Sequence, residues 1–259
     1  MRTVCITGAS GYIGSKIALF LSRQKEVEHI VGLDIRPPRQ AIPRFRFYQC
    51  DVRDPIDGIL EENAVDTMIH TAYVLPPIHD KGLMEDINVG GTKNVLTACA
   101  RHRVEHVLYT SSSTAYGFHP DNDHPLTETS RLRGNDDFTY SKNKREIELA
   151  IPVWLKGNQD LRLTILRPCF VVGPGFNNPL ARYLRKKIVP LPRRTEALQF
   201  VHEDDLEVAA GADRQAGAFA AALDDLGPAD EDRLVGHLFQ NRIGAAQDAL
   251  VLALGEDDA

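Results

Sequence analysis

The feature of this chain that most restricts its fold is a regular alternation of two hydrophobic periods over the first 170 residues. Short apolar runs are separated by longer stretches with helical spacing. The expected strands are Thr3–Thr7, His29–Leu33, Phe45–Cys50, Thr67–Thr71, His106–Thr110 and Leu161–Leu166. The expected helices are Tyr12–Gln24, Ile56–Asn63, Leu83–His102 and Phe138–Leu155. This alternation predicts an α/β fold, with a doubly wound parallel sheet covered by helices on both faces.

A proline interrupts the last of the expected helices. Pro152 has no backbone N–H, and its ring clashes with the preceding turn of a helix. We therefore expect this helix to kink or end near Ile151, and we place its uninterrupted part at Phe138–Ala150.

Composition excludes several other classes of protein. The 259 residues are 43% hydrophobic and 25% charged, as in globular proteins and unlike disordered or collagen-like chains. The net charge of −6 argues against a nucleic-acid binder, and no apolar run approaches the ~18 residues of a membrane span. The first residues lack the basic start and long apolar stretch of a signal peptide, so we expect a cytoplasmic protein.

The cysteines and histidines do not predict a metal site. Cys5, Cys50, Cys99 and Cys169 are far apart, without a C-x-x-C pair, and we interpret them as four buried thiols. The nine histidines include no H-E-x-x-H. We therefore expect no bound metal.

The first expected strand leads directly into a glycine-rich turn with the spacing G-x-x-G-x-x-G. The glycines are Gly8, Gly11 and Gly14, and a helical stretch begins at Tyr12 and Ile13. Glycine permits a positive φ, close approach of the backbone to a pyrophosphate and tight packing of the helix on the strand. The N–H groups and the dipole of the helix attract the diphosphate. The turn therefore predicts a dinucleotide site.

An acidic residue ends the second expected strand. A carboxylate at Asp34 can accept hydrogen bonds from the adenosine ribose and would repel a 2′-phosphate. Arg36, two residues later, could instead pair with that phosphate. We expect NAD as the cofactor, with NADP as the alternative.

The expected helix from Phe138 carries a Y-x-x-x-K pattern. Tyr140 and Lys144 share one helical face. A nearby ammonium lowers the pKa of a tyrosine from its usual ~10, so that the phenol can exchange a proton with a substrate hydroxyl. A serine-rich segment, residues 109–117, follows the fifth expected strand, and hydroxyls at the carboxyl edge of a parallel sheet lie where ligands bind.

Together these motifs resemble those of the extended short-chain dehydrogenases/reductases, in the NAD-dependent epimerase/dehydratase family. The resemblance covers about residues 1–210. The matching segments, in chain order, are the glycine turn, Asp34, Asp51-Val52, His70-Thr71-Ala72, Asn88–Val95, Ser111–Gly117, Tyr140 with Lys144, Leu166-Arg167-Pro168, Gly173-Pro174 and Phe200–Asp205.

The resemblance implies a Rossmann-type fold, with NAD bound at the glycine turn, and a role for each matched residue. Tyr140 would be the acid/base, Lys144 its partner and a ribose ligand, and Ser112 the donor to the substrate oxygen. Further cofactor contacts are expected at Asp51, Val52, Ala72, Asn88 and Pro168. Members of the family often form dimers through two helices, here Asn88–Arg101 and Tyr140–Ala150, so a homodimer is expected.

The chain departs from the family pattern at several places. Tyr73 stands where the family has a second alanine, and Glu203 replaces an apolar residue. Sugar-nucleotide epimerases carry an asparagine a few residues after the arginine of the sixth strand. Here Arg167-Pro168 is followed by no asparagine until Asn177, a form shared with family members that act on other small carbonyl compounds.

Three regions are expected. Residues 1–170 form the NAD-binding Rossmann domain, and residues 171–210 form part of a small substrate lobe whose basic stretch, 182–194, could receive a diphosphate. Residues 211–259 form an acidic, alanine-rich tail that leans toward disorder, and the substrate lobe could be truncated there.

The leading hypothesis is an NAD-dependent oxidoreductase or epimerase that acts by hydride transfer on a secondary alcohol or ketone. The expected partner is a small-molecule substrate, and a nucleotide sugar is favoured. One alternative is a reductase or dehydrogenase of a small non-nucleotide carbonyl compound. Another is a dinucleotide-binding sensor without turnover. Ser113 and Thr114 occupy the places where dehydratases more often carry an acidic pair, which disfavours dehydration.

Overall fold

The computed structural model describes residues 2–75, 80–158, 161–174 and 199–212. The chain divides into two compact units, Met1–Pro168 and Cys169–Ala259, and each is described by itself. The basic stretch 182–194 and nearly all of the acidic tail, from residue 213 on, lie outside the described residues.

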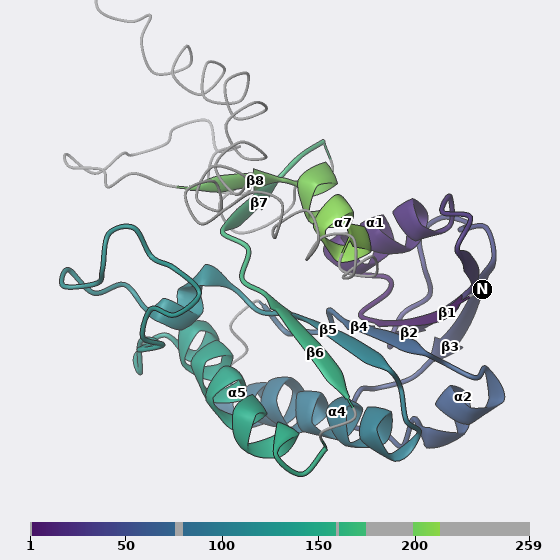
Figure 1. Cartoon of the computed structure of the whole chain (residues 1–259), viewed down its shortest axis with the longest axis horizontal. Helices are drawn as coiled ribbons and strands as arrows, with labels where there is room; N and C mark the ends of the chain where they lie inside the picture. Colours follow the sequence, from purple (N-terminus) through teal and green to yellow (C-terminus); the bar gives the residue numbers. More distant parts are fainter. Residues whose placement is uncertain (1, 76–79, 159–160, 175–198, 213–259) are drawn as a thin grey trace, which may run out of the picture. The chain divides into compact units, whose positions relative to one another are not determined.

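The first unit is built on a six-stranded sheet whose paired strands all run parallel (Figure 1). The strands are β1 (Arg2–Thr7), β2 (Val27–Asp34), β3 (Phe45–Gln49), β4 (Thr67–His70), β5 (His106–Thr110) and β6 (Arg162–Leu166). Their order is β3-β2-β1-β4-β5-β6, so the direction of winding reverses between β1 and β4. Open parallel sheets bind their ligands beyond the carboxyl ends of the strands at such a reversal.

Helical segments connect these strands. They are α1 (Tyr12–Leu21), α2 (Asp57–Glu62), α3 (Lys81–Glu85), the π-helical η1 (Asp86–Gly90), α4 (Gly91–Arg101), the 3₁₀ turn η2 (Ser113–Tyr116) and α5 (Thr139–Leu155). Figure 1 shows α4 and α5 side by side on one face of the sheet, and α1 on the opposite face. The fold class predicted from the sequence, a doubly wound parallel sheet, is therefore confirmed.

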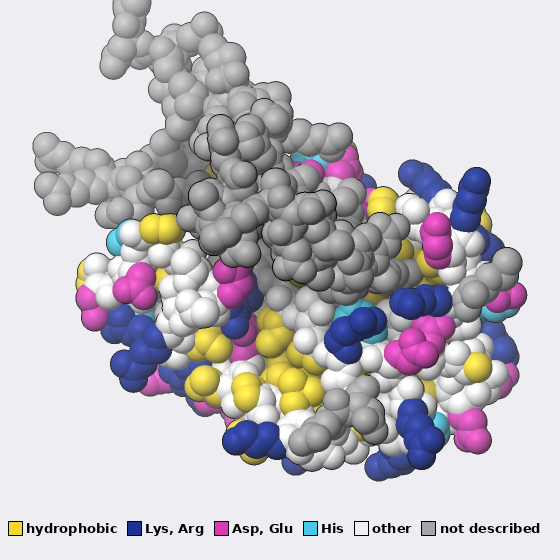
Figure 2. Space-filling view, in the orientation of Figure 1, with side chains coloured by type: hydrophobic (Ala, Val, Ile, Leu, Met, Phe, Trp, Pro, Cys, Tyr) yellow, Lys and Arg dark blue, Asp and Glu magenta, His cyan; other side chains and the backbone are white. Residues whose placement is uncertain are grey.

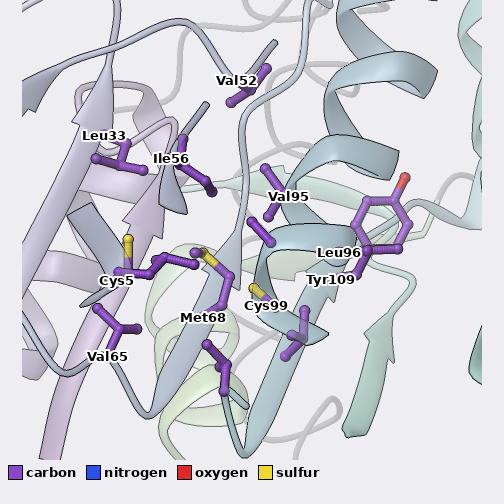
Figure 3. Packing of buried hydrophobic residues seen from close by; sticks show 14 of the residues in the cluster. Cys5, Leu33, Val52, Ile56, Val65, Met68, Val95, Leu96, Cys99 and Tyr109 are labelled. Carbon is purple, nitrogen blue, oxygen red and sulfur yellow. The ribbon is translucent and has the colours of Figure 1, made fainter. Parts of the chain in front are cut away.

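Burial follows the position of each strand in the sheet. The central strands β1, β4 and β5 are largely buried, whereas the edge strands β3 and β6 are partly exposed. Side chains from both the sheet and the helices α4 and α5 form one apolar cluster, and Figure 3 shows part of it around Met68, Cys99 and Tyr109. The continuous apolar runs in the sequence thus belong to strands with helices packed on both faces.

Two helices differ from the prediction. A kink or an end was expected near Ile151, and the end is wrong, because α5 continues through Pro152 to Leu155. The missing N–H of the proline affects only the last turn, and the buried Ile147 and Ile151 anchor the helix upstream of it. The expected helix Leu83–His102 consists of three segments, with η1 between α3 and α4.

The cysteines and the second unit complete the description. Cys5 and Cys99 are buried, but Cys50 and Cys169 are only half-buried, so the expectation of four buried thiols is wrong for two of them. The described part of the second unit consists of the parallel strands β7 (Phe170–Val172) and β8 (Phe200–His202), followed by α7 (Glu203–Ala212). Among the described residues, no helix has the length and apolar character to cross a membrane.

Candidate active site

The glycine-rich turn between β1 and α1 is held by close backbone contacts. Gly8 has a φ of +68°, which glycine adopts without strain, and its N–H donates to the carbonyl of Leu33 (2.8 Å). A Cβ on Gly8 would lie 2.7 Å from the backbone of Ala72, and a Cβ on Gly14 would lie 2.2 Å from the Gly8 carbonyl oxygen. The fold itself therefore requires glycine at these two positions.

Gly11 has fewer close neighbours than Gly8 and Gly14. In the described part of the chain, a Cβ on Gly11 would meet only the Gly8 carbonyl oxygen, at 3.0 Å. Gly11 is also the N-cap of α1, and no side chain caps the start of this helix at Tyr12 and Ile13. A helix N-terminus without a side-chain cap fits a phosphate group. The turn therefore fits the pyrophosphate of a dinucleotide.

The carboxylate of Asp34 fastens the end of β2 to the glycine turn. Its two oxygens accept hydrogen bonds from the N–H groups of Ser10 and Arg36, at 3.1 Å each. The Ser10 hydroxyl donates to the carbonyl of Arg36 (2.6 Å), which ties the same two segments together. Asp34 thus has a structural role that does not depend on a ligand. The remaining lone pairs of its carboxylate can accept hydrogen bonds from hydroxyl groups.

Asp51 and Val52 lie in a segment that α4 holds in place. Arg53 pairs with Asp51 (2.8 Å) and lowers the pKa of that carboxyl group. The Asn94 amide donates to the carbonyl of Val52 (2.8 Å), and a Cβ on Gly91 would lie 2.6 Å from the Val52 side chain. The residues from Gly91 to Asn94 therefore position the backbone of Val52.

The other expected cofactor contacts are engaged with the protein itself. The N–H of Ala72 donates to Thr7 Oγ1 (3.3 Å), and the carbonyl of Pro168 accepts from the Ser113 N–H (3.0 Å). The buried Asn88 is more fully occupied, because its side-chain oxygen and nitrogen bond the N–H and the carbonyl of Val74. Asn88 therefore orders the segment that follows β4.

The structure brings Ser112, Tyr140 and Lys144 together beyond the carboxyl end of β5. Tyr140 and Lys144 lie one turn apart on α5, and Ser112 is the N-cap of η2, where its Oγ accepts from the Thr114 N–H (3.2 Å). The Ser112 side chain lies near that of Tyr140 and acts to lower the pKa of the phenol. Lys144 Nζ lies 5.9 Å from the centre of the Tyr140 ring and donates to the Thr110 carbonyl (2.8 Å).

Burial governs the proton affinities of this pair. It raises the pKa of Tyr140, and the hydrogen bond with Ser112 opposes that rise. Burial also lowers the pKa of Lys144 to about 7, while the negative charge of Glu148 acts in the opposite direction. The sequence predicts a tyrosine whose pKa is lowered by its lysine, but in this structure burial raises the pKa of Tyr140 instead.

An ion pair not identified from the sequence ties α5 to the serine-rich segment. Arg167, just after β6, donates through Nε and Nη2 to Glu148 Oε2 (2.7 Å each). Glu148 also accepts from the Ser111 hydroxyl, and Arg167 Nη1 donates to the Tyr116 hydroxyl (2.8 Å). Glu148 lies one turn after Lys144, and this i,i+4 spacing is the signal that could have found it.

His70, at the end of β4, links the glycine turn to α4. Its Nδ1 lies 2.6 Å from Thr7 Oγ1 and its Nε2 lies 2.9 Å from Thr92 Oγ1. Because the Thr92 hydroxyl donates to the Asn88 carbonyl (2.6 Å), it accepts from Nε2–H, which leaves Nδ1 to accept from Thr7. Burial lowers the pKa of His70 to about 3, so the ring is neutral.

Comparisons with known proteins identify the family of the chain. The model of the NAD dependent epimerase/dehydratase family matches residues 4–207. An uncharacterized protein of Mycobacterium tuberculosis is 29% identical over 238 residues, covering 87% of this chain and 63% of its own length. Short-chain dehydrogenase/reductase family 42E member 1 of Macaca fascicularis is 30% identical, with 79% and 56% covered. The chain thus spans less than two thirds of either relative.

The solved structures agree on the fold. A UDP-glucuronic acid 4-epimerase from Bacillus cereus, in complex with NAD, superimposes with a TM-score of 0.71 at 22% identity, covering 83% of this chain and 74% of that one. The family match extends over most of the chain and includes the glycine turn, the residues that follow β5, and the Tyr140–Lys144 helix. The chain therefore belongs to the NAD-dependent epimerase/dehydratase family.

Proposed function

We propose that the chain binds NAD and catalyses hydride transfer on a secondary alcohol or ketone of a nucleotide sugar, as an oxidoreductase or epimerase. One observation carries the proposal. The glycine turn after β1 and the Ser112–Tyr140–Lys144 group after β5 lie at the same carboxyl edge of one parallel sheet. The B. cereus neighbour, an NAD-bound epimerase of a UDP-sugar, supports the substrate class.

The side chains of this group suit proton exchange at a substrate oxygen. Bound NAD would accept and return the hydride. The Tyr140 phenolate takes the hydroxyl proton as an alcohol is oxidised and returns it as a ketone is reduced, while Ser112 donates a hydrogen bond to the same oxygen. The Lys144 ammonium stabilises the phenolate because an opposite charge nearby favours the ionised form. Such positioned proton transfer contributes ~10²–10⁴-fold to a rate.

The cofactor contacts expected from the family pattern remain part of the proposal. Asp34 would accept the ribose hydroxyls and favour NAD over NADP, since two negative groups would repel each other. The backbone near Val52 and Ala72 would contact the adenine and the ribose, and Pro168 would lie near the nicotinamide. Asn88 would act through the segment that it orders rather than by direct contact.

One observation favours the alternative substrate class. The rings of Phe138 and Phe118 extend from the Tyr140 ring toward the surface. The ring centroids of Phe118 and Phe138 are 6.3 Å apart, and those of Phe138 and Tyr140 are 5.8 Å apart. Phe118 is 64% exposed and Phe138 is 45% exposed. An apolar, aromatic surface beside the proposed acid/base suits a non-nucleotide carbonyl compound with an apolar body.

We also propose that the chain forms a homodimer through α4 and α5. Figure 2 shows hydrophobic side chains gathered on the face that these helices present in this view. On α5, Leu149 and Val153 are 54% and 71% exposed. Light scattering should give the mass of a dimer, and Val153→Glu should shift it toward the monomer, because a charge would be buried in the interface.

Mass spectrometry of protein purified without added ligand tests the proposed function. Copurified NAD or NADH, followed by NADH formation with a panel of nucleotide sugars and apolar alcohols, would support it and separate the two substrate classes. Tight NAD binding without turnover on any candidate would indicate a sensor. Failure to bind either NAD or NADP in a titration would refute the proposal.

A further inference from the structure

The backbone of Tyr73 is clamped on both sides. The N–H of Ala72 donates to Thr7 Oγ1 (3.3 Å), and the N–H of Val74 donates to Asn88 Oδ1 (2.8 Å). The same Asn88 side chain donates to the Val74 carbonyl (3.3 Å). These hydrogen bonds hold the backbone on both sides of Tyr73 and do not depend on which side chain is at that position. The backbone is therefore fixed at this position, where the family has an alanine.

The Tyr73 ring lies against both members of the proposed catalytic pair. Lys144 Nζ lies over the ring, 3.9 Å from its centroid, well inside the ~6 Å range of a cation–π interaction. The ring meets that of Tyr140 edge-on, with centroids 5.2 Å apart and planes at 80°. The Tyr73 hydroxyl donates to the Tyr140 carbonyl (3.4 Å), which ties the ring to α5. An alanine could make none of these contacts.

Lys144 is buried without an ion pair to any described residue. Of its three N–H donors, two bond the Thr110 carbonyl (2.8 Å) and the Tyr109 hydroxyl (3.3 Å), and both acceptors are neutral. A buried charge without a counter-charge is costly. The negative faces of two rings, Tyr73 at 3.9 Å and Tyr109 at 4.9 Å, offset part of that cost.

We propose that Tyr73 is a positioning residue whose ring, together with that of Tyr109, forms an aromatic cage that keeps the Lys144 ammonium charged and beside Tyr140. The cage is a property of the chain alone. Its consequence for catalysis rests on the proposed function.

The ionisable groups that face Lys144 come from three elements. They are Tyr140 and Glu148 on α5, Tyr109 on β5, and His70 and Tyr73 at the end of β4. His70 is neutral, and Glu148 is already bound by Arg167 and Ser111. Among the groups that are not part of the core of the sheet, the Tyr73 ring lies closest to the ammonium.

Loss of the ring would change the charge of Lys144 in the physiological range. A desolvated cation–π contact corresponds to a shift of about 0.5–1.5 pH units. Burial already lowers the pKa of Lys144 to about 7, and each further fall of one unit reduces the ratio of charged to neutral amine about tenfold. The phenolate of Tyr140 would then lose its stabilising charge.

Three substitutions separate the ring from the volume and the hydroxyl of Tyr73. Tyr73→Phe retains the ring, whereas Tyr73→Leu and Tyr73→Met retain apolar bulk without it. The titration of Lys144 is followed by NMR in the complete chain labelled with ¹³Cε-lysine, without NAD, and its signal is assigned by its absence in Lys144→Met. We expect the midpoint to fall by about 0.5–1.5 pH units in the Leu and Met variants and to stay at the wild-type value in the Phe variant. The other lysine signals should be the same in every variant.

Two results would overturn the cage. One is a common midpoint in all four proteins, and the other is an equal fall in the Phe and Leu variants, which would assign the effect to the hydroxyl. If the Leu variant does not fold, the comparison of Met with Phe decides in the same way.

NAD affinity and the pH profile of kcat, measured on the same samples, separate the cage from the proposed function. Absence of NAD binding in the wild type would refute the function and leave the NMR result standing. In an active enzyme, the alkaline limb of kcat should move to lower pH in the Leu variant and not in the Phe variant. A limb that stays in place despite the NMR shift would refute the catalytic consequence.

Discussion

Replacing Arg167 with methionine should destabilise the protein by about 3–4 kcal/mol at pH 7. The Glu148 side chain is fully buried, so loss of the two 2.7 Å hydrogen bonds from Arg167 leaves a carboxylate without its counter-charge. The acid can escape by binding a proton, at about 1.4 kcal/mol for each pH unit above the usual glutamic acid pKa of ~4.3. That route limits the loss to about 4 kcal/mol at pH 7, and the loss should shrink as the pH is lowered.

Urea unfolding followed by the fluorescence of Trp154, the single tryptophan, measures this loss. The double variant Arg167→Met/Glu148→Leu replaces the pair with apolar side chains and should recover most of the stability, because a buried ion pair adds little over apolar packing. A loss below about 1 kcal/mol in Arg167→Met would refute the reasoning. A double variant no more stable than Arg167→Met would refute it as well.

Four further predictions follow from the site. Gly11→Val should abolish NAD binding in calorimetry, because its side chain would stand where a pyrophosphate approaches α1, and retained affinity would contradict this. Gly14→Ala should instead lower the unfolding midpoint, since its Cβ would lie 2.2 Å from a carbonyl oxygen; an unchanged midpoint would contradict this. Tyr140→Phe should retain NAD affinity and lower turnover by at least ~10²-fold, and a full rate would exclude its catalytic assignment. His70 has a folded pKa of about 3 against ~6.5 unfolded. Its contribution to the free energy of unfolding should be constant above pH 6.5 and should fall by up to about 1.4 kcal/mol per pH unit below it. Urea unfolding of His70→Gln should lack that part of the slope.

The sheet could be predicted from the sequence because its signal is local. Runs such as Val4–Ile6 are apolar without an alternating polar residue, which is the pattern of a strand with both faces covered. The end of α5 could not be predicted in this way. The cost of Pro152 is local, but the burial of Ile147 and Ile151 that holds the helix depends on contacts with distant parts of the chain.

The placement of Tyr140 and Lys144 on one face follows from helical geometry, and the sequence was sufficient for it. The surroundings of the pair were not predictable. The pairing of the Asn88 amide with Val74 arises only when the segment after β4 meets η1, so no local pattern indicates it. The rise in the pKa of Tyr140 has the same origin, because desolvation depends on the packing of the whole unit.

The buried charges around Lys144 explain why a ring contact matters there. Glu148 is the carboxylate one turn along α5, but Arg167 and the Ser111 hydroxyl occupy its oxygens, so it acts on Lys144 through its charge at a distance and not through a hydrogen bond. The guanidinium of Arg167 cancels part of even that effect, since it brings a positive charge to the same carboxylate. The rings that surround the ammonium add negative potential that this carboxylate does not supply. The Tyr73 ring, 3.9 Å away on a backbone that Asn88 holds in place, is the nearer of the two rings of the cage.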